Sequence, residues 1–120
     1  RLKTRRAPLA HECRAMQEAN LHRLIMLEAS KRGHRLFRNN IGALQDQNGQ
    51  WVRFGVGGPG GSDLIGWTAG GKFAAIEVKL EKRRTSPEQV SFISAVKQAG
   101  CVAGVARSVE EAMSILSGDY

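Results

Sequence analysis

The chain has little of several features that mark particular classes of protein. Its two cysteines, Cys13 and Cys101, lie far apart and lack the paired spacing of a zinc site, so we interpret them as small buried hydrophobic residues. No apolar run is long enough to cross a bilayer, and no stretch near the start resembles a signal peptide. No internal repeat or low-complexity tract is present. We therefore expect a soluble, non-secreted protein, and its 120 residues suit one compact domain.

Acidic residues are also scarce relative to basic ones. The chain has 18 lysines and arginines against 11 aspartates and glutamates, which gives a net charge of +7 and a pI near 10.1. The basic excess is concentrated in "RLKTRR" at residues 1–6 and in "KLEKRR" at residues 79–84. This distribution indicates a polyanionic partner, although charge alone does not distinguish nucleic acid from acidic lipid.

Helix, strand and turn signals follow one another in a clear order along the chain. Gly33 stands where a left-handed residue would end a helix, and Ser86 with Gln89 and Ser108 with Glu111 have capping-box spacing. The order of helix, five strands, helix, strand and helix predicts an α/β fold with a mixed β-sheet flanked by helices. The expected elements are a helix at 10–32, a strand at 34–40, a hairpin at 41–55 around Asn48-Gly49, strands at 62–67 and 72–80, a helix at 86–99, a strand at 101–106 and a helix at 108–116.

An aspartate, a glutamate and a lysine lie close together in "GGSDLIGWTAGGKFAAIEVKL", residues 60–80. In an extended strand Glu77 and Lys79 point to the same face, about 7 Å apart. A two-residue turn at Gly70-Gly71 would place Leu64 opposite Glu77, whereas a three-residue turn at 69–71 would place Asp63 there. We favour the three-residue turn, because glycine suits the left-handed position that such hairpins need.

In that register the two carboxylates lie about 5 Å apart at Cβ, close enough to share a divalent cation. Magnesium prefers hard oxygen ligands and keeps several waters, so Asp63, Glu77, a backbone carbonyl and waters would suffice. The ammonium of Lys79 could then stabilise charge that develops on a phosphate or hold the attacking water. The alternative is an exposed hairpin with an ordinary Glu-Lys pair, since E-x-K is common, but the preceding aspartate and the basic loop favour a metal site.

Several motifs together resemble the virus-type replication-repair nuclease (VRR-NUC) family of the PD-(D/E)XK nuclease superfamily. They are "GGSDLIG", "AAIEVK" and "SPEQ", and the resemblance runs from about Glu18 through "RNNIG" and "WVRFG" to "VARSVEE". It implies a restriction-endonuclease-like core over residues 10–120, preceded by a basic arm at residues 1–9. It also implies metal binding by Asp63, Glu77 and the Val78 carbonyl, with Lys79 as the catalytic lysine. A serine, Ser62, stands where the family often has a proline before the aspartate.

The family also carries an acidic residue on the first helix and a glutamine after the E-x-K strand. By resemblance these are Glu18, as a further metal ligand, and Gln89. Leu21, Leu24 and Ile25 define the expected buried stripe of the helix, and Glu18 lies at its edge; Glu28 also falls near that stripe. As a catalytic residue Gln89 would orient a water or a DNA phosphate. Its alternative role is that of the N3 residue in a capping box, and the two roles are compatible.

The resemblance implies a Mg²⁺-dependent endonuclease, with Mn²⁺ substituting, that cleaves branched DNA as a homodimer and resolves four-way (Holliday) junctions. The site would hold one or two metals, which the sequence leaves open. The expected location is the cytoplasm of a bacterium or a virus-infected host cell. The alternatives are a nickase or exonuclease on linear or flapped DNA, and a non-catalytic nucleic-acid-binding domain on the same fold. The residues expected to contact the DNA backbone are Lys82, Arg83, Arg84, Arg38, Lys3, Arg5 and Arg6.

Overall fold

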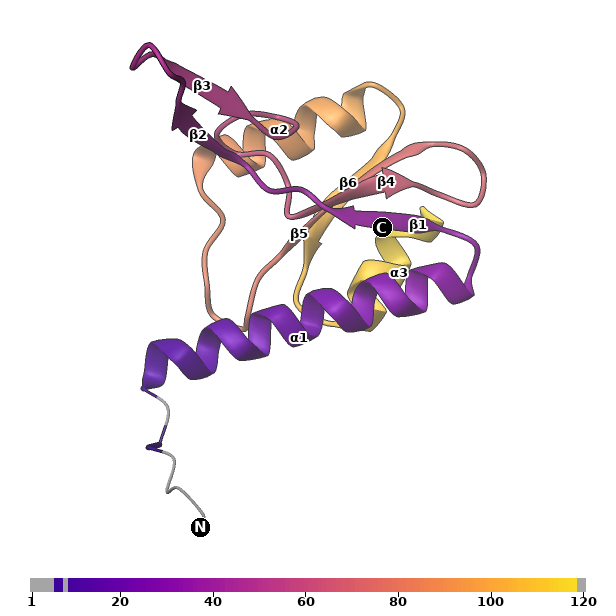
Figure 1. Cartoon of the computed structure of the whole chain (residues 1–120). Helices are drawn as coiled ribbons and strands as arrows, with labels where there is room; N and C mark the ends of the chain where they lie inside the picture. The colour runs from indigo at the N-terminus through magenta and orange to yellow at the C-terminus, as the bar shows by residue number, and fades with distance from the viewer. Residues whose placement is uncertain (1–5, 8, 119–120) are drawn as a thin grey trace.

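The computed structural model describes residues 6–7 and 9–118 and has the predicted order of elements. Figure 1 shows a central sheet with helices on both sides. This arrangement confirms the predicted α/β class with a mixed sheet flanked by helices. The elements are α1 (Ala10–Lys31), β1 (Arg35–Arg38), β2 (Gly42–Gln45), β3 (Trp51–Phe54), β4 (Leu64–Trp67), β5 (Phe73–Val78), α2 (Pro87–Gln98), β6 (Val102–Ala106) and α3 (Val109–Ser117).

Side-chain caps begin the second and third helices. At α2 the Ser86 hydroxyl accepts a hydrogen bond from the Gln89 backbone N–H, and the Gln89 side chain accepts one from the Ser86 N–H, so the predicted capping box is present. At α3 the Ser108 hydroxyl accepts from the Glu111 N–H, but the Glu111 carboxylate accepts from the N–H of Arg107. The box predicted at α3 is therefore only half formed, because the carboxylate reaches one residue further back.

The main sheet has the strand order β1-β4-β5-β6, in which β5 and β6 are parallel and the other pairs are antiparallel. Successive side chains of β5 point to opposite faces of the sheet, so the core has two layers. Ala74, Ile76 and Val78 pack in the cluster that contains α1 and α3 residues, and Ala75 packs in the cluster of α2. The helices α1 and α3 thus cover one face of the sheet, and α2 covers the other (Figure 1). Within residues 6–7 and 9–118, no helix is long and apolar enough to cross a membrane.

The strands β2 and β3 form a separate hairpin that projects from the body of the protein (Figure 1). The predicted Asn48-Gly49 turn is present, and Gly49 adopts a φ of 77°. The hairpin exposes Leu44, Trp51, Val52 and Phe54. The radius of gyration is 16.5 Å, against about 13.6 Å for a compact domain of this length, because the hairpin and the start of α1 extend outward.

Both cysteines are only half-buried, so the prediction that they are buried hydrophobic residues was too strong. Cys101 follows α2 and packs at the edge of the α2 cluster, where the chain turns into β6. Cys13 lies in the first turns of α1, which extend past the sheet and so lack a neighbouring layer (Figure 1).

Candidate active site at the β4–β5 hairpin

The β4–β5 hairpin brings Asp63 and Glu77 to one end of the sheet. Leu64 lies opposite Ile76 in the antiparallel register. A turn at 69–71 joins the strands; a 2.8 Å backbone hydrogen bond closes it, and its last residue is a glycine with a φ of 89°. Continuing the register by one residue places Asp63 opposite Glu77. The predicted three-residue turn and the predicted pairing of the two carboxylates are therefore confirmed.

Asp63 is held by backbone groups on two sides. Its Oδ2 accepts a hydrogen bond of 3.0 Å from the Val78 N–H, and its carbonyl accepts one of 2.8 Å from the Asn39 N–H. The Asn39 side chain also donates to the carbonyls of Val56 and Ser62 and accepts from the Val56 N–H. Asn39 thus joins the end of β1 to both ends of the glycine-rich loop at residues 55–61. These contacts fix the chain where it enters β4.

Glu77 is almost completely buried, at 2% exposure. Its Oε2 accepts a hydrogen bond of 3.0 Å from the Gln89 side chain and lies 3.6 Å from Lys79 Nζ, whereas its Oε1 has no hydrogen-bond partner among the described residues. Burial and then the repulsion from Asp63 raise the pKa of Glu77 to about 7, although Lys79 opposes the rise. A buried carboxylate with an unpaired oxygen fits a cation ligand.

Asp63 has the opposite shift. Burial alone would raise the pKa of Asp63, but the contacts with His22, the Val78 N–H and Glu77 together outweigh burial and lower it. Adjacent carboxylates repel each other when both are ionised, so one of the pair retains a proton at higher pH. A divalent cation between them would remove that repulsion and allow both to ionise.

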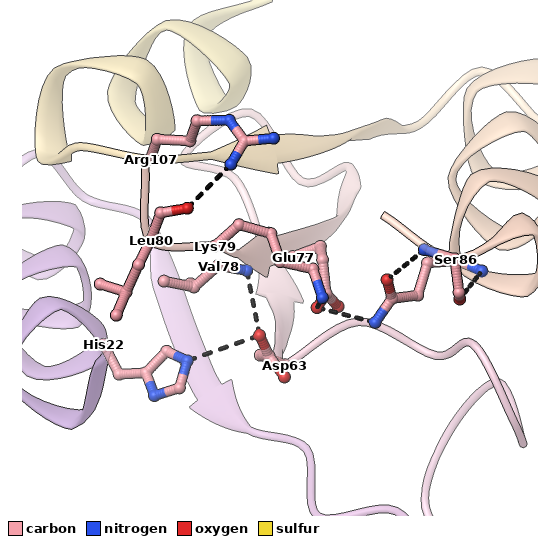
Figure 2. Close-up of polar contacts among 9 residues, drawn as sticks. His22, Asp63, Glu77, Val78, Lys79, Leu80, Ser86 and Arg107 are labelled. Atoms are coloured by element: carbon pink, nitrogen blue, oxygen red, sulfur yellow. Dashed lines mark hydrogen bonds and ion pairs between the residues drawn. The ribbon is translucent and has the colours of Figure 1, made fainter. Parts of the chain in front are cut away.

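The first helix contributes a histidine that the sequence analysis missed. His22 Nε2 lies 3.5 Å from Asp63 Oδ2, as Figure 2 shows, and the imidazole is 6% exposed. Glu18 is one turn earlier on the same helix, and one donor atom from each of Glu18, His22 and Asp63 lies within 4.8 Å of the others. The i, i+4 spacing of Glu18 and His22 was the signal available in the sequence.

Of the two glutamates considered on the first helix, Glu18 and not Glu28 lies beside Asp63. Glu28 forms an ion pair of 3.0 Å with Arg32, one turn further along the helix, whereas Glu18 lies with Asp63. The buried stripe of α1 is His22, Ile25 and Ala29, so the expectation that Leu24 belongs to it was wrong. Leu24 is exposed because the helix is rotated to bring its 18-22-25-29 face to the sheet.

Basic side chains line the clefts that contain Glu18 and Asp63. A cleft of 330 Å³ beside α1 is lined by Glu18 and His22 together with Arg14, Arg38 and Arg83. A second cleft, of 460 Å³, is lined by Asp63 and again by Arg38. Lys82 and Arg84 are exposed on the loop between β5 and α2. Arg6 is exposed but pairs with Glu12 at 2.7 Å, and the predicted contacts at Lys3 and Arg5 lie outside the described residues.

We expect the raised pKa of Glu77 to make the chelated protein less stable as pH rises from about 4.5 to about 7. In this window folded Glu77 keeps its proton while the unfolded chain loses it, so each rise in pH favours unfolding. The shift of Asp63 acts only near and below its ordinary value of 3.8, outside this window. Glu77→Gln keeps an oxygen that accepts the hydrogen bond from Gln89, and it removes the cost of ionising a buried carboxylate. Loss of the attraction to Lys79 offsets part of this gain in stability.

Urea unfolding in chelator should therefore find Glu77→Gln more stable than wild type at pH 8 by roughly 1–3 kcal/mol, with the difference vanishing near pH 4.5. Glu110→Gln, an exposed substitution in the first turn of α3, should follow wild type at every pH. A difference for Glu77→Gln that is independent of pH would show that Glu77 is not protonated in the folded protein.

One of three comparisons with known proteins gave a match. The profile of the VRR-NUC domain matches residues 15–110, which include most of α1, the hairpin with Asp63 and Glu77, and the start of α3. None of the curated proteins and none of the solved structures matches the chain. Since the profile covers most of the chain, this protein belongs to the VRR-NUC family and is a nuclease of the PD-(D/E)XK type.

Proposed function

We propose that the protein is a metal-dependent, structure-selective endodeoxyribonuclease that resolves four-way DNA junctions as a homodimer. Residues 10–120 form its nuclease domain and residues 1–9 a basic arm. The observation that carries the proposal is the placement of Asp63, Glu77 and Lys79 at one end of the β4–β5 hairpin, beside a cleft with arginines on its walls.

The donor atoms at this end of the sheet suit Mg²⁺, with Mn²⁺ substituting. Asp63 and Glu77 supply carboxylate oxygens, one of them buried and unpaired, and the Val78 carbonyl and Glu18 are further oxygen donors. When bound, the cation would lower the pKa of a coordinated water and neutralise charge on the phosphate. The reaction is direct attack of water on phosphorus in line with the leaving oxygen, without a covalent enzyme intermediate.

Lys79 and Gln89 have different roles in this site. Lys79 lies 3.6 Å from Glu77 and is 17% exposed, and we assign its ammonium to the negative charge that would develop on a scissile phosphate beside Glu77. Gln89 caps α2 through its oxygen, as the sequence suggested, and also donates its side-chain N–H to Glu77. We assign Gln89 as a positioning residue for the Glu77 carboxylate.

The DNA backbone would lie across Lys82, Arg83, Arg84 and Arg38. Arg38 lines both clefts, and Arg83 lines the cleft that contains Glu18, so both cations line clefts that contain a carboxylate of the site. Contacts of this type hold phosphates without reading bases, so selectivity would come from the shape of a branched substrate. Within this family the sequence resemblance favours a symmetric junction, which presents two equivalent strands to two equivalent sites.

The projecting β2–β3 hairpin is the surface we assign to the second copy. Leu44, Val52 and Phe54 lie on one face of it and are exposed, and an apolar patch on a projecting element is typical of an interface. Leu44→Ser together with Val52→Ser should convert a dimer to a monomer in sedimentation velocity, while the circular dichroism spectrum stays unchanged because neither side chain is in the core. A wild-type protein that sediments as a monomer would contradict the assignment.

Cleavage of three matched DNA substrates tests the function. Wild-type protein is incubated with a four-way junction, a 5′ flap and a linear duplex of the same sequence, each with Mg²⁺, with Mn²⁺ or with chelator. The proposal predicts paired symmetric cuts in the junction with metal, and little cleavage of linear duplex. Preferred cleavage of the flap or of a duplex end would support the alternative nickase or exonuclease. Binding without cleavage under every condition would support a non-catalytic domain.

We further expect the basic loop to set the salt dependence of DNA binding. Each phosphate contact that releases counterions contributes about 0.9 to the slope of log affinity against log salt, so the Lys82→Ala/Arg83→Ala/Arg84→Ala variant should lower the slope by roughly 2–3. Lys31→Ala with Lys72→Ala is the control, because both lysines are exposed and lie at the opposite ends of α1 and of the β5 strand from the clefts. An unchanged slope in the loop variant would place the DNA elsewhere.

A further inference from the structure

The β2–β3 hairpin has a second face, which carries an aromatic and a basic side chain. In the hairpin register Trp51 lies opposite Gln45 and Arg53 lies opposite Ala43, so Trp51 and Arg53 share the face that is not assigned to the second copy. Trp51 is 69% exposed, more than any other large hydrophobic residue that the structure describes. It belongs to neither core cluster, so its indole is available for contact with another molecule.

The foot of the hairpin forms part of the candidate active site. Ile41 and Phe54, at the two ends of the hairpin, line the 460 Å³ cleft that contains Asp63. The chain is closely packed there, because a Cβ on Gly55 would stand 2.6 Å from the Asn40 carbonyl oxygen. A phosphate bound at Asp63 would therefore lie beside the foot of this projecting arm (Figure 1).

The charges on the hairpin suit a nucleic acid. Within its sequence Arg53 is the only basic residue and Asp46 the only acidic one. The Asp46 carboxylate accepts hydrogen bonds of 2.8 and 2.9 Å from the backbone N–H groups of Asn48 and Gln50, so its charge is engaged within the turn. Arg53 lies about 7 Å from Trp51 along one strand face, which places a cation next to an exposed aromatic ring. An indole can stack on any base, and a guanidinium can bind the neighbouring phosphate.

The position of Trp51 along the hairpin fits the branch of a DNA substrate. Trp51 is three residues from Phe54, so it lies about 10 Å from the foot, a distance that spans about three nucleotides of a strand. Phe54 borders the cleft from one face of the hairpin, and Trp51 is on the opposite face. DNA with one arm in the cleft would thus have the hairpin between that arm and the next one.

We propose that the Trp51 indole stacks on a nucleobase at the branch point of the DNA, with Arg53 on an adjacent phosphate. The inference rests on the proposed function, because it takes branched DNA as the ligand. In a continuous duplex each base is covered by its neighbours, whereas a branch exposes base faces where two arms separate. Stacking tolerates any sequence, so this contact selects for the shape of the substrate.

Binding to a four-way junction and to a linear duplex with the same ends, both in chelator, tests the contact. Trp51→Ala should weaken junction binding roughly 5- to 150-fold and leave duplex binding nearly unchanged. Its salt slope should equal that of wild type, because stacking releases no counterions, whereas Arg53→Ala should lower the slope by roughly 0.9. Trp51→Phe, which keeps an aromatic ring, should recover most of the affinity, and Trp51→Leu, which keeps only apolar bulk, should not.

Fluorescence locates the base. Trp67→Phe leaves Trp51 as the only tryptophan, and the change is mild because Trp67 is 51% exposed and packs on the ring of Phe37. The emission of Trp51 should be quenched by the junction and much less by the duplex. A fluorescent base analogue, 2-aminopurine, placed at successive positions should respond most strongly at the branch.

Four results would overturn the inference. They are wild-type junction affinity in Trp51→Ala, an equal loss of affinity for junction and duplex, full affinity in Trp51→Leu, and an affinity loss that accompanies altered sedimentation, which would place Trp51 against the second copy. None of these measurements involves cleavage. A protein that cleaves junctions without needing Trp51 keeps the proposed function and loses this contact, and one that needs Trp51 to bind junctions but never cleaves them does the reverse.

Discussion

Replacing Asp63 with asparagine should abolish DNA cleavage while DNA binding persists. The substitution keeps the side-chain shape and an oxygen that accepts the Val78 N–H, so the hairpin should not change. It removes the charge that lies opposite Glu77 and faces His22, and with it a proposed metal ligand. We expect a loss of roughly 10³-fold or more in the cleavage rate under single-turnover conditions.

Binding to the junction should be equal to or tighter than that of wild type in chelator. Clustered carboxylates repel a phosphate when no cation neutralises them, and Asp63→Asn lowers that repulsion without touching the basic loop. Gel-shift titration in chelator measures this directly. Glu110→Gln removes an equal charge from an exposed position on α3 and should leave both cleavage and binding unchanged. Substantial cleavage by Asp63→Asn would exclude Asp63 as a metal ligand.

The hairpin that carries the site was predictable from the sequence because local rules determine it. Side chains alternate along a strand, and a one-residue slip would move Asp63 to the other face, so the length of the turn decides whether two carboxylates meet. The three-residue turn and the glycine with positive φ agree with that reasoning. Helix ends were equally local, since Ser86 and Gln89 lie three residues apart and cap each other.

His22 was not predictable in the same way, because its role depends on how α1 packs. The apolar residues of α1 suggested a stripe through Leu21, Leu24 and Ile25, but the helix packs with the 22-25-29 face inward and leaves Leu24 exposed. Several large apolar residues occur around this helix, so its sequence does not specify one face strongly. The rotation about the helix axis is set by contacts with the sheet, which are far apart in sequence.

The β2–β3 hairpin shows a second limit of local reasoning. Its strands and its Asn48-Gly49 turn were predicted, yet nothing in the alternation of residues indicated that it would stand apart from the main sheet. Leu44, Trp51 and Phe54 would suit a packed strand equally well. Their exposure in the isolated chain is a property of the tertiary structure, and it is the reason that the hairpin carries the proposed contact with a second copy.

Replacing Lys79 with methionine should slow the chemical step and leave metal binding in place. Methionine keeps the unbranched stem that packs at the end of β5, and it leaves Asp63, Glu77 and the Val78 backbone untouched. The loss is the ammonium 3.6 Å from Glu77, which would stabilise negative charge on the phosphate as the bond breaks. We expect the single-turnover rate at saturating protein to fall roughly 10²-fold or more.

Loss of the ammonium also removes the neighbour that opposes the rise in the pKa of Glu77, so Lys79→Met should bind Mg²⁺ more weakly at pH 6 than at pH 8. Measuring the rate at pH 8 with saturating metal separates the catalytic loss from this effect. Lys72→Met is the matched control, because Lys72 is exposed just before the other end of the same strand and should cleave like wild type. If Lys79→Met recovered the wild-type rate at high pH and high metal, Lys79 would act only by keeping Glu77 ionised, and the stabilisation of the phosphate would have to come from Arg38 or Arg83 across the cleft.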